Sequence, residues 1–343
     1  MKALTLTAYN EFEYSEAPDP EIKANEVLIS VKACGICGSD IHGMDGSSGR
    51  RIPPIIMGHE ASGEISAVGS NVTDWQVGDR VTFDSTVYCG DCPECNSGQI
   101  NLCPTRNVLG VSCVDYRRHG AFAELVKVPD HILCAIPEGL SYEHAAFAEP
   151  VSIALHGVNR LPLQEGDSAV VIGAGLIGLL VVQALKAKGA GKVIAVDIDE
   201  KRLAMAKELG ADATLISGEE VPAEVRKIVG NEDGADVAVE VVGFGPTINL
   251  AIDSVRKGGS ISCVGNLKAE VPFPLQAVVT RELSVYGSCA SAGEYDDAVE
   301  AVATGAIKVE PLISAIADLK DGADWFQRLY KNDEGLMKVI LKP

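Results

Sequence analysis

Four cysteines that stand close together are the first residues in this sequence whose types and spacing could do chemistry. Gaps of two, two and seven residues separate Cys89, Cys92, Cys95 and Cys103. Glycine and proline lie among them and predict a loop. Four thiolates at this spacing can close a tetrahedral zinc site, and a closed all-sulfur site leaves no position for a substrate. We therefore expect a structural zinc; two disulfides are the alternative, which fits poorly with a chain whose thiols are expected to be reduced.

A second set of candidate metal ligands is dispersed along the first half of the chain. It consists of Cys37 in a C-G-I-C-G-S-D-I-H run, His59 and Glu60 in G-H-E, and Glu149 in A-E-P. Sulfur, nitrogen and oxygen ligands with one open position are what a catalytic zinc requires. Pro150 suits the first turn of a helix, so Glu149 is expected at the N-cap of a helix over 151–158. Glutamate is not a favoured cap, which suggests another task for its carboxylate. Spacing alone leaves a metal site and no metal site equally open.

A glycine-rich turn predicts a nucleotide site. The run V-V-I-G-A-G-L-I-G at 170–178 is typical of a buried strand that turns through G-x-G-x-x-G into a helix. Such glycines permit a tight turn, a close approach to a pyrophosphate and close helix–strand packing. The free N–H groups of the helix favour phosphate binding. The residues expected to contact the cofactor in this loop are Gly173, Gly175, Leu176, Ile177 and Gly178.

An acidic residue follows the glycine turn at the distance expected for a dinucleotide site. Asp197 ends the next predicted strand, nineteen positions after Gly178, where a carboxylate would bind the ribose diol. A turn or cap at the end of the strand is the alternative reading. Ile198 and Asp199 come next, so no arginine directly follows Asp197 to offset its repulsion of a 2′-phosphate. The expected cofactor is NAD rather than NADP.

These motifs, in this order and at this separation, resemble the zinc-containing medium-chain dehydrogenase family over nearly the whole chain. The sorbitol (L-iditol) and related polyol dehydrogenases are the most similar subgroup, because Glu149 stands where liver-type alcohol dehydrogenases carry cysteine. The resemblance implies an NAD-linked oxidation of a secondary alcohol, in a polyol or polyol phosphate, to the ketose, with two zinc ions per chain. Threonine 3-dehydrogenase and 2,3-butanediol dehydrogenase are alternative activities.

The resemblance also implies a role for each candidate residue. Cys37, His59 and Glu149 would bind the catalytic zinc, with Glu60 bound directly or through water. The substrate proton would leave through the hydroxyl of Ser39 and the cofactor ribose to His42. Asp40 would orient the ligand histidine, His59. A helix-capping Ser39 and a surface His42 are the plain alternatives.

Two departures from the sorbitol dehydrogenase pattern put sorbitol itself in doubt. Gly43 stands where those enzymes carry a tyrosine, and the segment Gly287–Ala290 stands where they carry an arginine near the substrate. Both changes predict a more open pocket or one of different polarity. Arginines at 50, 51, 117 and 118 are interpreted as solvated surface charges rather than as a phosphate or carboxylate site.

The elements that must position these residues change in character along the chain. Short runs broken by turn residues, such as 26–32, 63–68 and 80–83, predict a β-rich first part. From about residue 167, buried strands alternate with helices, which indicates a doubly wound parallel sheet. The resemblance implies an α/β fold with three segments: a GroES-like catalytic domain over 1–157 with a zinc lobe at 88–104, a Rossmann domain over 158–288, and a return to the catalytic domain over 289–343.

Composition limits the possible partners. At 343 residues the chain is long enough for two domains, and a net charge of −19 disfavours nucleic acid and anionic membranes. A zinc-ribbon module is disfavoured by this charge and because basic residues do not interleave with the cysteines. A relative that binds nucleotide without catalysis is disfavoured, because Cys37, His59 and Glu149 are all present. The uncharged stretch 168–185 contains the glycine turn and is read as a strand and helix rather than a membrane span. We expect a cytoplasmic homodimer or homotetramer that acts on a small-molecule alcohol.

Overall fold

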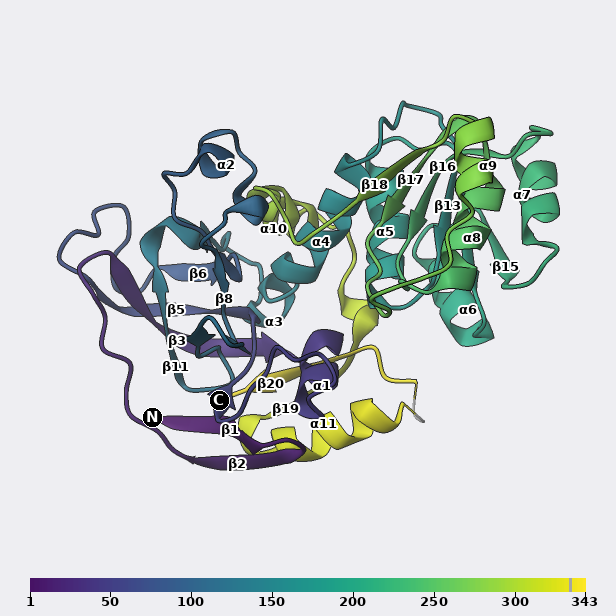
Figure 1. Cartoon of the computed structure of the whole chain (residues 1–343). Coiled ribbons are helices and arrows are strands. Elements are labelled where there is room, and N and C mark those ends of the chain that lie inside the picture. Colours follow the sequence, from purple (N-terminus) through teal and green to yellow (C-terminus); the bar gives the residue numbers. More distant parts are fainter. Residues whose placement is uncertain (333–334) are drawn as a thin grey trace. The chain divides into compact units, whose positions relative to one another are not determined.

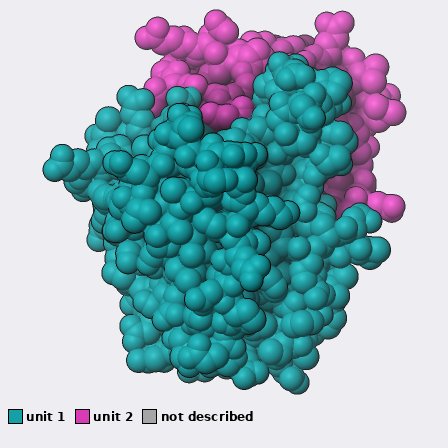
Figure 2. Space-filling model, turned by 90° about the vertical axis from the view of Figure 1, so that its left-hand side faces the viewer, with its two compact units in different colours: residues 1–149, 295–305, 309–343 teal, residues 150–294, 306–308 magenta. Residues whose placement is uncertain are grey.

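Two hydrophobic cores divide the chain in the computed structural model, which describes residues 1–332 and 335–343. Unit 1 comprises residues 1–149, 295–305 and 309–343, and unit 2 comprises residues 150–294 and 306–308 (Figure 2). The expected limits, at 157 and 289, fall within unit 2. Helix α4 (Ala148–Asn159) explains this, because its His156 Nδ1 lies 2.9 Å from Glu294 Oε1 and ties both ends of the segment into unit 2.

The main sheet of unit 1 has seven strands, and the last strand of the chain lies beside one of the first (Figure 1). In spatial order, six of its strands are β12 (Leu133–Ala135), β6 (Arg80–Phe83), β5 (Glu60–Val68), β3 (Glu26–Gly35), β20 (Lys338–Lys342) and β19 (Ile313–Asp318). The seventh strand, β11 (Leu125–Pro129), also pairs with β3. Buried side chains recur along β3, as expected for a strand in a half-buried antiparallel sheet.

Three strand ends meet at one point of this sheet. Glu60, the first residue of β5, pairs with Gly35, the last residue of β3. Strand β20 begins at Lys338 and pairs with the same end of β3, since Ile340 lies opposite Gly35. Just beyond Gly35 the chain enters helix α1 (Gly38–Met44). Residues far apart in sequence are therefore brought together where β3 turns into α1.

The remaining elements of unit 1 are short strands and helices around this sheet. The strands are β1 (Lys2–Ala8), β2 (Glu11–Glu16), β4 (Ile55–Ile56), β7 (Thr86–Val87), β8 (Asn107–Val108), β9 (Val111–Ser112) and β10 (Arg117–Arg118). The helices are α2 (Pro93–Asn96), α3 (Tyr142–Ala145), α10 (Tyr295–Ala303) and α11 (Gly322–Lys331), and short 3-10 turns stand at Ile100–Leu102, Asp130–Ile132, Glu310–Leu312 and Leu319–Asp321.

Unit 2 is a parallel six-stranded sheet with helices on both faces (Figure 1). Its spatial order is β15 (Ala213–Ile216), β14 (Val193–Asp197), β13 (Ala169–Ile172), β16 (Ala235–Glu240), β17 (Val255–Cys263) and β18 (Ser284–Gly287). The helices are α5 (Leu176–Ala187), α6 (Glu200–Glu208), α7 (Val221–Val229), α8 (Gly245–Ser254) and α9 (Leu275–Thr280). This is the order of a doubly wound nucleotide-binding sheet, and the predicted fold class is confirmed.

The uncharged stretch 168–185 is the strand β13 followed by the helix α5, as the glycine turn indicated. Among residues 1–332 and 335–343, no helix combines the length and the apolar character needed to cross a bilayer.

Candidate active site

Cys37 and Asp40 form the first turn of helix α1. Cys37 is the N-cap, and its Sγ accepts a hydrogen bond from Ser39 N–H at 3.5 Å. Asp40 Oδ2 accepts the Cys37 N–H at 3.4 Å, so the two side chains complete a reciprocal capping box. The Cys37 sulfur is therefore held at the start of α1, beside the N–H groups of its first turn.

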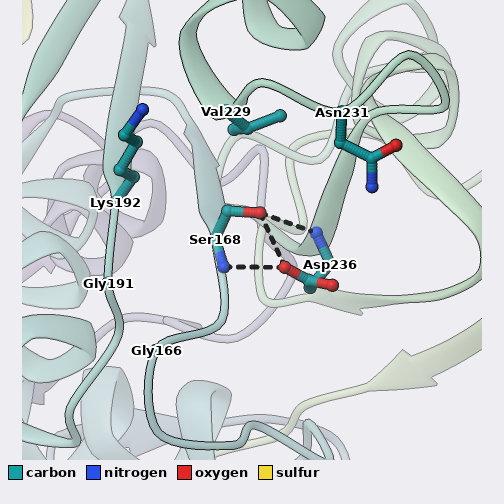
Figure 3. A pocket seen from close by; sticks show the side chains of 7 residues that line it. All are labelled: Gly166, Ser168, Gly191, Lys192, Val229, Asn231 and Asp236. Carbon is teal, nitrogen blue, oxygen red and sulfur yellow. Dashed lines mark hydrogen bonds between the residues drawn. The ribbon is translucent and has the colours of Figure 1, made fainter.

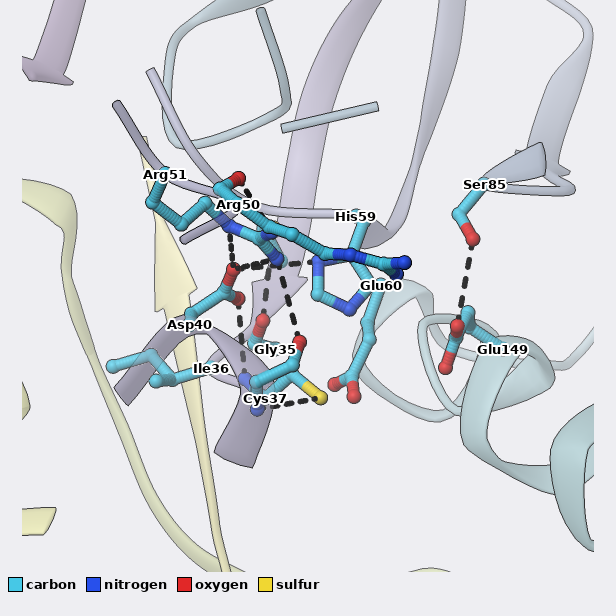
Figure 4. Close-up of polar contacts among 12 residues, drawn as sticks. Gly35, Ile36, Cys37, Asp40, Arg50, Arg51, His59, Glu60, Ser85 and Glu149 are labelled. Atoms are coloured by element: carbon cyan, nitrogen blue, oxygen red, sulfur yellow. Dashed lines mark hydrogen bonds and ion pairs between the residues drawn. The ribbon is translucent and has the colours of Figure 1, made fainter. Parts of the chain in front are cut away.

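Cys37, His59 and Glu60 converge in one cluster, in which Cys37 is half-buried and the other two are buried. One ligand atom from each lies within 4.8 Å of the others, and Figure 4 shows the three side chains turned toward one another. His59 is 5% exposed and Glu60 is 1% exposed. A thiol, an imidazole and a carboxylate held in this way offer the mixed sulfur, nitrogen and oxygen donors that a catalytic zinc takes. The donor set fits the metal that the sequence predicts.

Asp40 lies behind the imidazole of His59, as predicted. His59 Nδ1 stands 3.4 Å from Asp40 Oδ1, which leaves Nε2 as the nitrogen that can face a metal. No well-aligned hydrogen bond reaches this buried Nδ1 among the described residues, so the contact is electrostatic. Burial would raise the pKa of Asp40, but His59 and Arg51 outweigh burial and hold it well below its usual range. Asp40 is thus a fixed anion beside the ligand histidine.

Lys338 is a member of this site that sequence reasoning missed. Its Nζ forms a buried ion pair with Glu60 Oε2 and donates to the Ile36 carbonyl at 3.0 Å. Burial would lower the pKa of Lys338, but the attraction of Glu60 outweighs it and the pKa is raised. Gly35 leaves the space, because a Cβ there would lie 2.4 Å from Glu60 Oε2. A lysine directly before the apolar run V-I-L was the available signal.

Glu149 is buried but lies outside the group formed by Cys37, His59 and Glu60. Ser85 Oγ donates to Glu149 Oε1 at 3.4 Å (Figure 4). Burial raises the pKa of Glu149 to about 7. By smaller amounts, His59 lowers this pKa and Glu60 raises it, so the charges of all three residues interact. The expected N-cap position is wrong: α4 begins at Ala148, so Glu149 lies within its first turn.

The two relay candidates lie on helix α1. Ser39 and His42 are both exposed, and residues three apart on a helix share a face. Ser39 Oγ accepts a hydrogen bond from Arg51 Nη2 at 3.3 Å. The arrangement places a hydroxyl beside the cluster and an imidazole next to solvent.

Arg51 corrects the expectation of a solvated surface charge. Its side chain is only 4% exposed and forms an ion pair with Asp40, with Nη2 at 3.0 Å from Oδ1. Gly43 makes this burial possible, because it leaves the space that the Arg51 stem fills. Of the two outcomes expected at Gly43, the space is not left open but is filled by a charged side chain. The neighbouring Arg50 is exposed, as expected.

The four cysteines of the loop 89–103 come together as their spacing predicted. Their sulfur atoms lie within 4.8 Å of one another, and Cys89 Sγ is 3.9 Å from Cys95 Sγ. All ten cysteines are free of disulfides. A tetrahedral zinc with Zn–S bonds of about 2.3 Å has sulfur atoms about 3.8 Å apart, so the residues fit a zinc ion. Burial would raise the pKa of Cys103, but hydrogen bonds from Thr105 and the Cys89 N–H lower it to about 6, which favours the thiolate.

The glycine turn of unit 2 has the geometry of a pyrophosphate loop. A Cβ on Gly178 would lie 1.8 Å from the Gly173 carbonyl oxygen, so only glycine fits there. Helix α5 begins after Gly175, and no side chain caps it, so Leu176 and Ile177 stand in a first turn with free N–H groups. These features suit an anionic ligand at the carboxyl end of β13.

Asp197 stands at the end of β14 and is buried against the glycine turn. Its Oδ2 accepts the Ala174 N–H at 2.6 Å and its Oδ1 accepts the Asp199 N–H at 3.0 Å. Arg202, on α6, has its Nη1 4.0 Å from Asp197 Oδ2. An arginine does therefore lie beside Asp197 in space, although none directly follows it in sequence.

A pocket at the amino ends of these strands is lined by polar groups that bond to one another (Figure 3). Ser168 donates to Asp236 Oδ2 through its N–H at 2.8 Å and its Oγ at 2.7 Å. Arg256 Nε pairs with Asp236 Oδ1 at 2.7 Å. These bonds join β13 to β16 at their amino ends, whereas ligands of such sheets bind at the carboxyl ends. We interpret this pocket as structural.

Comparison with known proteins identifies relatives of both units. The model of the alcohol dehydrogenase GroES-like domain matches residues 23–138, and the model of the zinc-binding dehydrogenases matches residues 177–304. A sorbitol dehydrogenase of Bacillus subtilis is 37% identical over 347 aligned positions, which cover 100% of this chain and 97% of that protein.

Solved structures resemble the whole chain as well. Galactitol-1-phosphate dehydrogenase of Escherichia coli aligns with a TM-score of 0.92 at 30% identity and covers 100% of both chains. A candidate zinc-binding dehydrogenase of Sinorhizobium meliloti, solved with NADP, aligns with a TM-score of 0.90 at 33% identity over 100% of this chain and 99% of that one.

Proposed function

The chain belongs to the zinc-binding dehydrogenases of the medium-chain family, and on that premise we propose that it oxidises a secondary alcohol of a polyol to a ketone, with NAD and two zinc ions. The observation that carries the proposal is the convergence of Cys37, His59 and Glu60 at the start of helix α1, which also carries Ser39. Sulfur, imidazole and carboxylate donors next to a proton acceptor suit a metal-assisted alcohol oxidation.

Each residue has a defined task in this reaction. Zinc would supply Lewis-acid activation of the substrate hydroxyl, and the dinucleotide would accept the hydride. Cys37 and His59 would hold the metal, together with one of the carboxylates of Glu60 and Glu149. Asp40 keeps the His59 ring in one orientation. Ser39 Oγ would take the proton of the substrate hydroxyl, and the exposed His42 would pass a proton to water.

Two buried carboxylates favour a polyol over a simple alcohol. Glu60 and Glu149 lie in one electrostatic environment, and ionised carboxylates can accept hydrogen bonds from several hydroxyl groups. An aliphatic alcohol offers one hydroxyl group, so it can form fewer hydrogen bonds with these carboxylates than a polyol can. The similarity to a sorbitol dehydrogenase and to a galactitol-1-phosphate dehydrogenase supports the same substrate class.

The proposal for NAD rests on Asp197. Its carboxylate can accept hydrogen bonds from the ribose diol and would repel a 2′-phosphate. Arg202, 4.0 Å away, weakens that repulsion, and a similar protein binds NADP. We therefore expect a preference for NAD of moderate size. Asp197→Ser should shift the ratio of kcat/KM for NADP to that for NAD upward by at least tenfold, and Arg202→Ala should shift it downward. A wild-type enzyme that prefers NADP would contradict the assignment.

The substrate proposal is tested by kcat/KM with NAD across sorbitol, xylitol, galactitol 1-phosphate, threonine, 2,3-butanediol and ethanol. We expect a polyol or polyol phosphate to have the highest value. If threonine or 2,3-butanediol has the highest kcat/KM, the proposed substrate class is wrong, but the proposed alcohol oxidation stands. Ethanol above every diol would contradict the argument from buried carboxylates. Light scattering on the same protein tests a further proposal, that the chain forms a homodimer or homotetramer.

A further inference from the structure

Arg51 contacts two residues of the site at once. Its Nη2 donates to Asp40 Oδ1 at 3.0 Å, and its Nε lies 3.3 Å from the same carboxylate oxygen (Figure 4). Nη2 also donates to Ser39 Oγ at 3.3 Å. Ser39 is the proposed proton acceptor and Asp40 orients the ligand histidine. One buried guanidinium thus links the relay hydroxyl to the support of the metal site.

The Arg51 side chain is confined along its whole length. A Cβ on Gly43 would lie 2.1 Å from Arg51 Cγ, 3.1 Å from its Cβ and 3.3 Å from its Cδ, so the stem packs directly on the Gly43 backbone. The neighbouring backbone is tied to β9, because Ile52 N–H donates to the Ser112 carbonyl at 2.9 Å and Ser112 N–H donates to the Arg50 carbonyl at 3.1 Å. Nη1 also donates to the Arg50 carbonyl at 3.1 Å. The guanidinium is therefore held in place before any substrate arrives.

This contact limits what the Ser39 hydroxyl can do. A serine hydroxyl carries one proton and two lone pairs, whereas a guanidinium only donates. Arg51 therefore occupies one lone pair of Ser39 Oγ and cannot take its proton. The other lone pair stays available to a substrate hydroxyl, and the Ser39 proton must leave in another direction.

We propose that Arg51 is a positioning residue that fixes the direction of proton transfer through Ser39 and holds Asp40 against His59. This inference rests on the proposed alcohol oxidation. In that reaction the dinucleotide would supply the hydride acceptor for the carbinol carbon, and Ser39 Oγ would take the proton of the substrate hydroxyl. The proton already on Ser39 leaves toward His42 and water, while Arg51 stays protonated throughout.

Substitution of Arg51 tests the relay. Arg51→Ala should lower kcat at least thirtyfold while KM for NAD changes less than threefold, because the cofactor loop is in unit 2. The solvent isotope effect on kcat should rise, since proton transfer becomes slower than the steps around it. Guanidinium chloride at millimolar concentration should raise the kcat of Arg51→Ala at least tenfold. Sodium chloride at equal ionic strength should not raise it. Arg51→Lys keeps the charge without the planar fork and should show an intermediate kcat.

A second readout needs no turnover. Zinc release to a chelator should be at least fivefold faster in Arg51→Ala and Arg51→Lys, because Asp40 is no longer held against His59. Arg117→Ala, which removes an exposed arginine, is the matched control and should match the wild type in both assays. Unchanged kcat, isotope effect and zinc release in Arg51→Lys would overturn the proposal, as would a loss of kcat that guanidinium does not restore. If the wild type oxidises no alcohol, the proposed function fails, and zinc release still tests the contact with Asp40.

Discussion

The backbone of Gly43 is in direct contact with the stem of Arg51, so a Cβ atom on Gly43 would lie 2.1 Å from Arg51 Cγ. The two residues share one space, and the arginine is buried only because the glycine lacks a side chain. A side chain at position 43, such as the tyrosine expected from the resemblance to sorbitol dehydrogenases, could not coexist with this placement of Arg51.

Gly43→Ala should disturb both stability and turnover. Overpacking of a confined site costs about 1–3 kcal/mol, and relief of the clash must move Arg51 away from Ser39 and Asp40. We expect a lower midpoint of urea unfolding and a kcat reduced at least tenfold. The double variant Gly43→Ala with Arg51→Ala should be less destabilised than the sum of the single changes, because the clash is then absent. If the changes in the free energy of unfolding of the two single variants add up to that of the double variant, Gly43 and Arg51 act independently.

Lys338→Met should destabilise the protein by about 3–5 kcal/mol, because it leaves the buried carboxylate of Glu60 without its partner. Lys342→Met, on the same strand, removes an exposed lysine and should cost less than about 1 kcal/mol. Urea unfolding of the two variants measures both losses of stability, and the two substitutions lie on the same strand, β20. The double change Glu60→Gln with Lys338→Met should recover part of the loss. Equal effects at 338 and 342 would contradict a buried ion pair at Glu60.

Glu294 should make the stability of unit 2 depend on pH. Burial would raise the pKa of Glu294, but hydrogen bonds from His156, Ala292 N–H and Asn159 outweigh it and lower the pKa to about 2 from an ordinary 4.5. A lowered pKa stabilises the fold above the unfolded value, and the contribution is lost as pH falls from 4.5 toward 2.

Thermal unfolding of Glu294→Gln against the wild type tests this dependence. The variant should be less stable at pH 7 by about 1–2 kcal/mol, and the difference should shrink steadily below pH 4.5. Glu310→Gln removes an exposed carboxylate that also pairs with a histidine, and should leave the unfolding temperature nearly unchanged. If the difference in stability between Glu294→Gln and the wild type stays constant down to pH 3, the ionised carboxylate of Glu294 is not the source of that stability.

Local patterns predicted the fold and the types of metal ligand. The glycine turn at 173–178 and the cysteine loop 89–103 are short enough for their own residues to set their geometry. Strand alternation in unit 2 predicted the parallel sheet, and Asp197 ends β14 as predicted. These elements depend mainly on neighbours in sequence, so the sequence carries their signal.

Contacts between distant residues account for what sequence reasoning missed. Lys338 and Glu60 are 278 positions apart and meet only because β20 lies beside β3. Asp197 ends β14 and Arg202 lies in the first turn of α6, and the sequence does not show how the turn between the two elements brings their side chains together. The start of α4 was placed too late, because Ala148 and Glu149 are already helical before Pro150.

Zinc content per chain, measured together with NAD reduction by a polyol, tests the central claim most directly. The wild type should hold two zinc ions, and Cys37→Ala should hold one, stay folded and show no turnover. Cys95→Ala should lose the other ion and lose stability, because the loop 89–103 is no longer closed. Two zinc ions or wild-type turnover in Cys37→Ala would contradict the account.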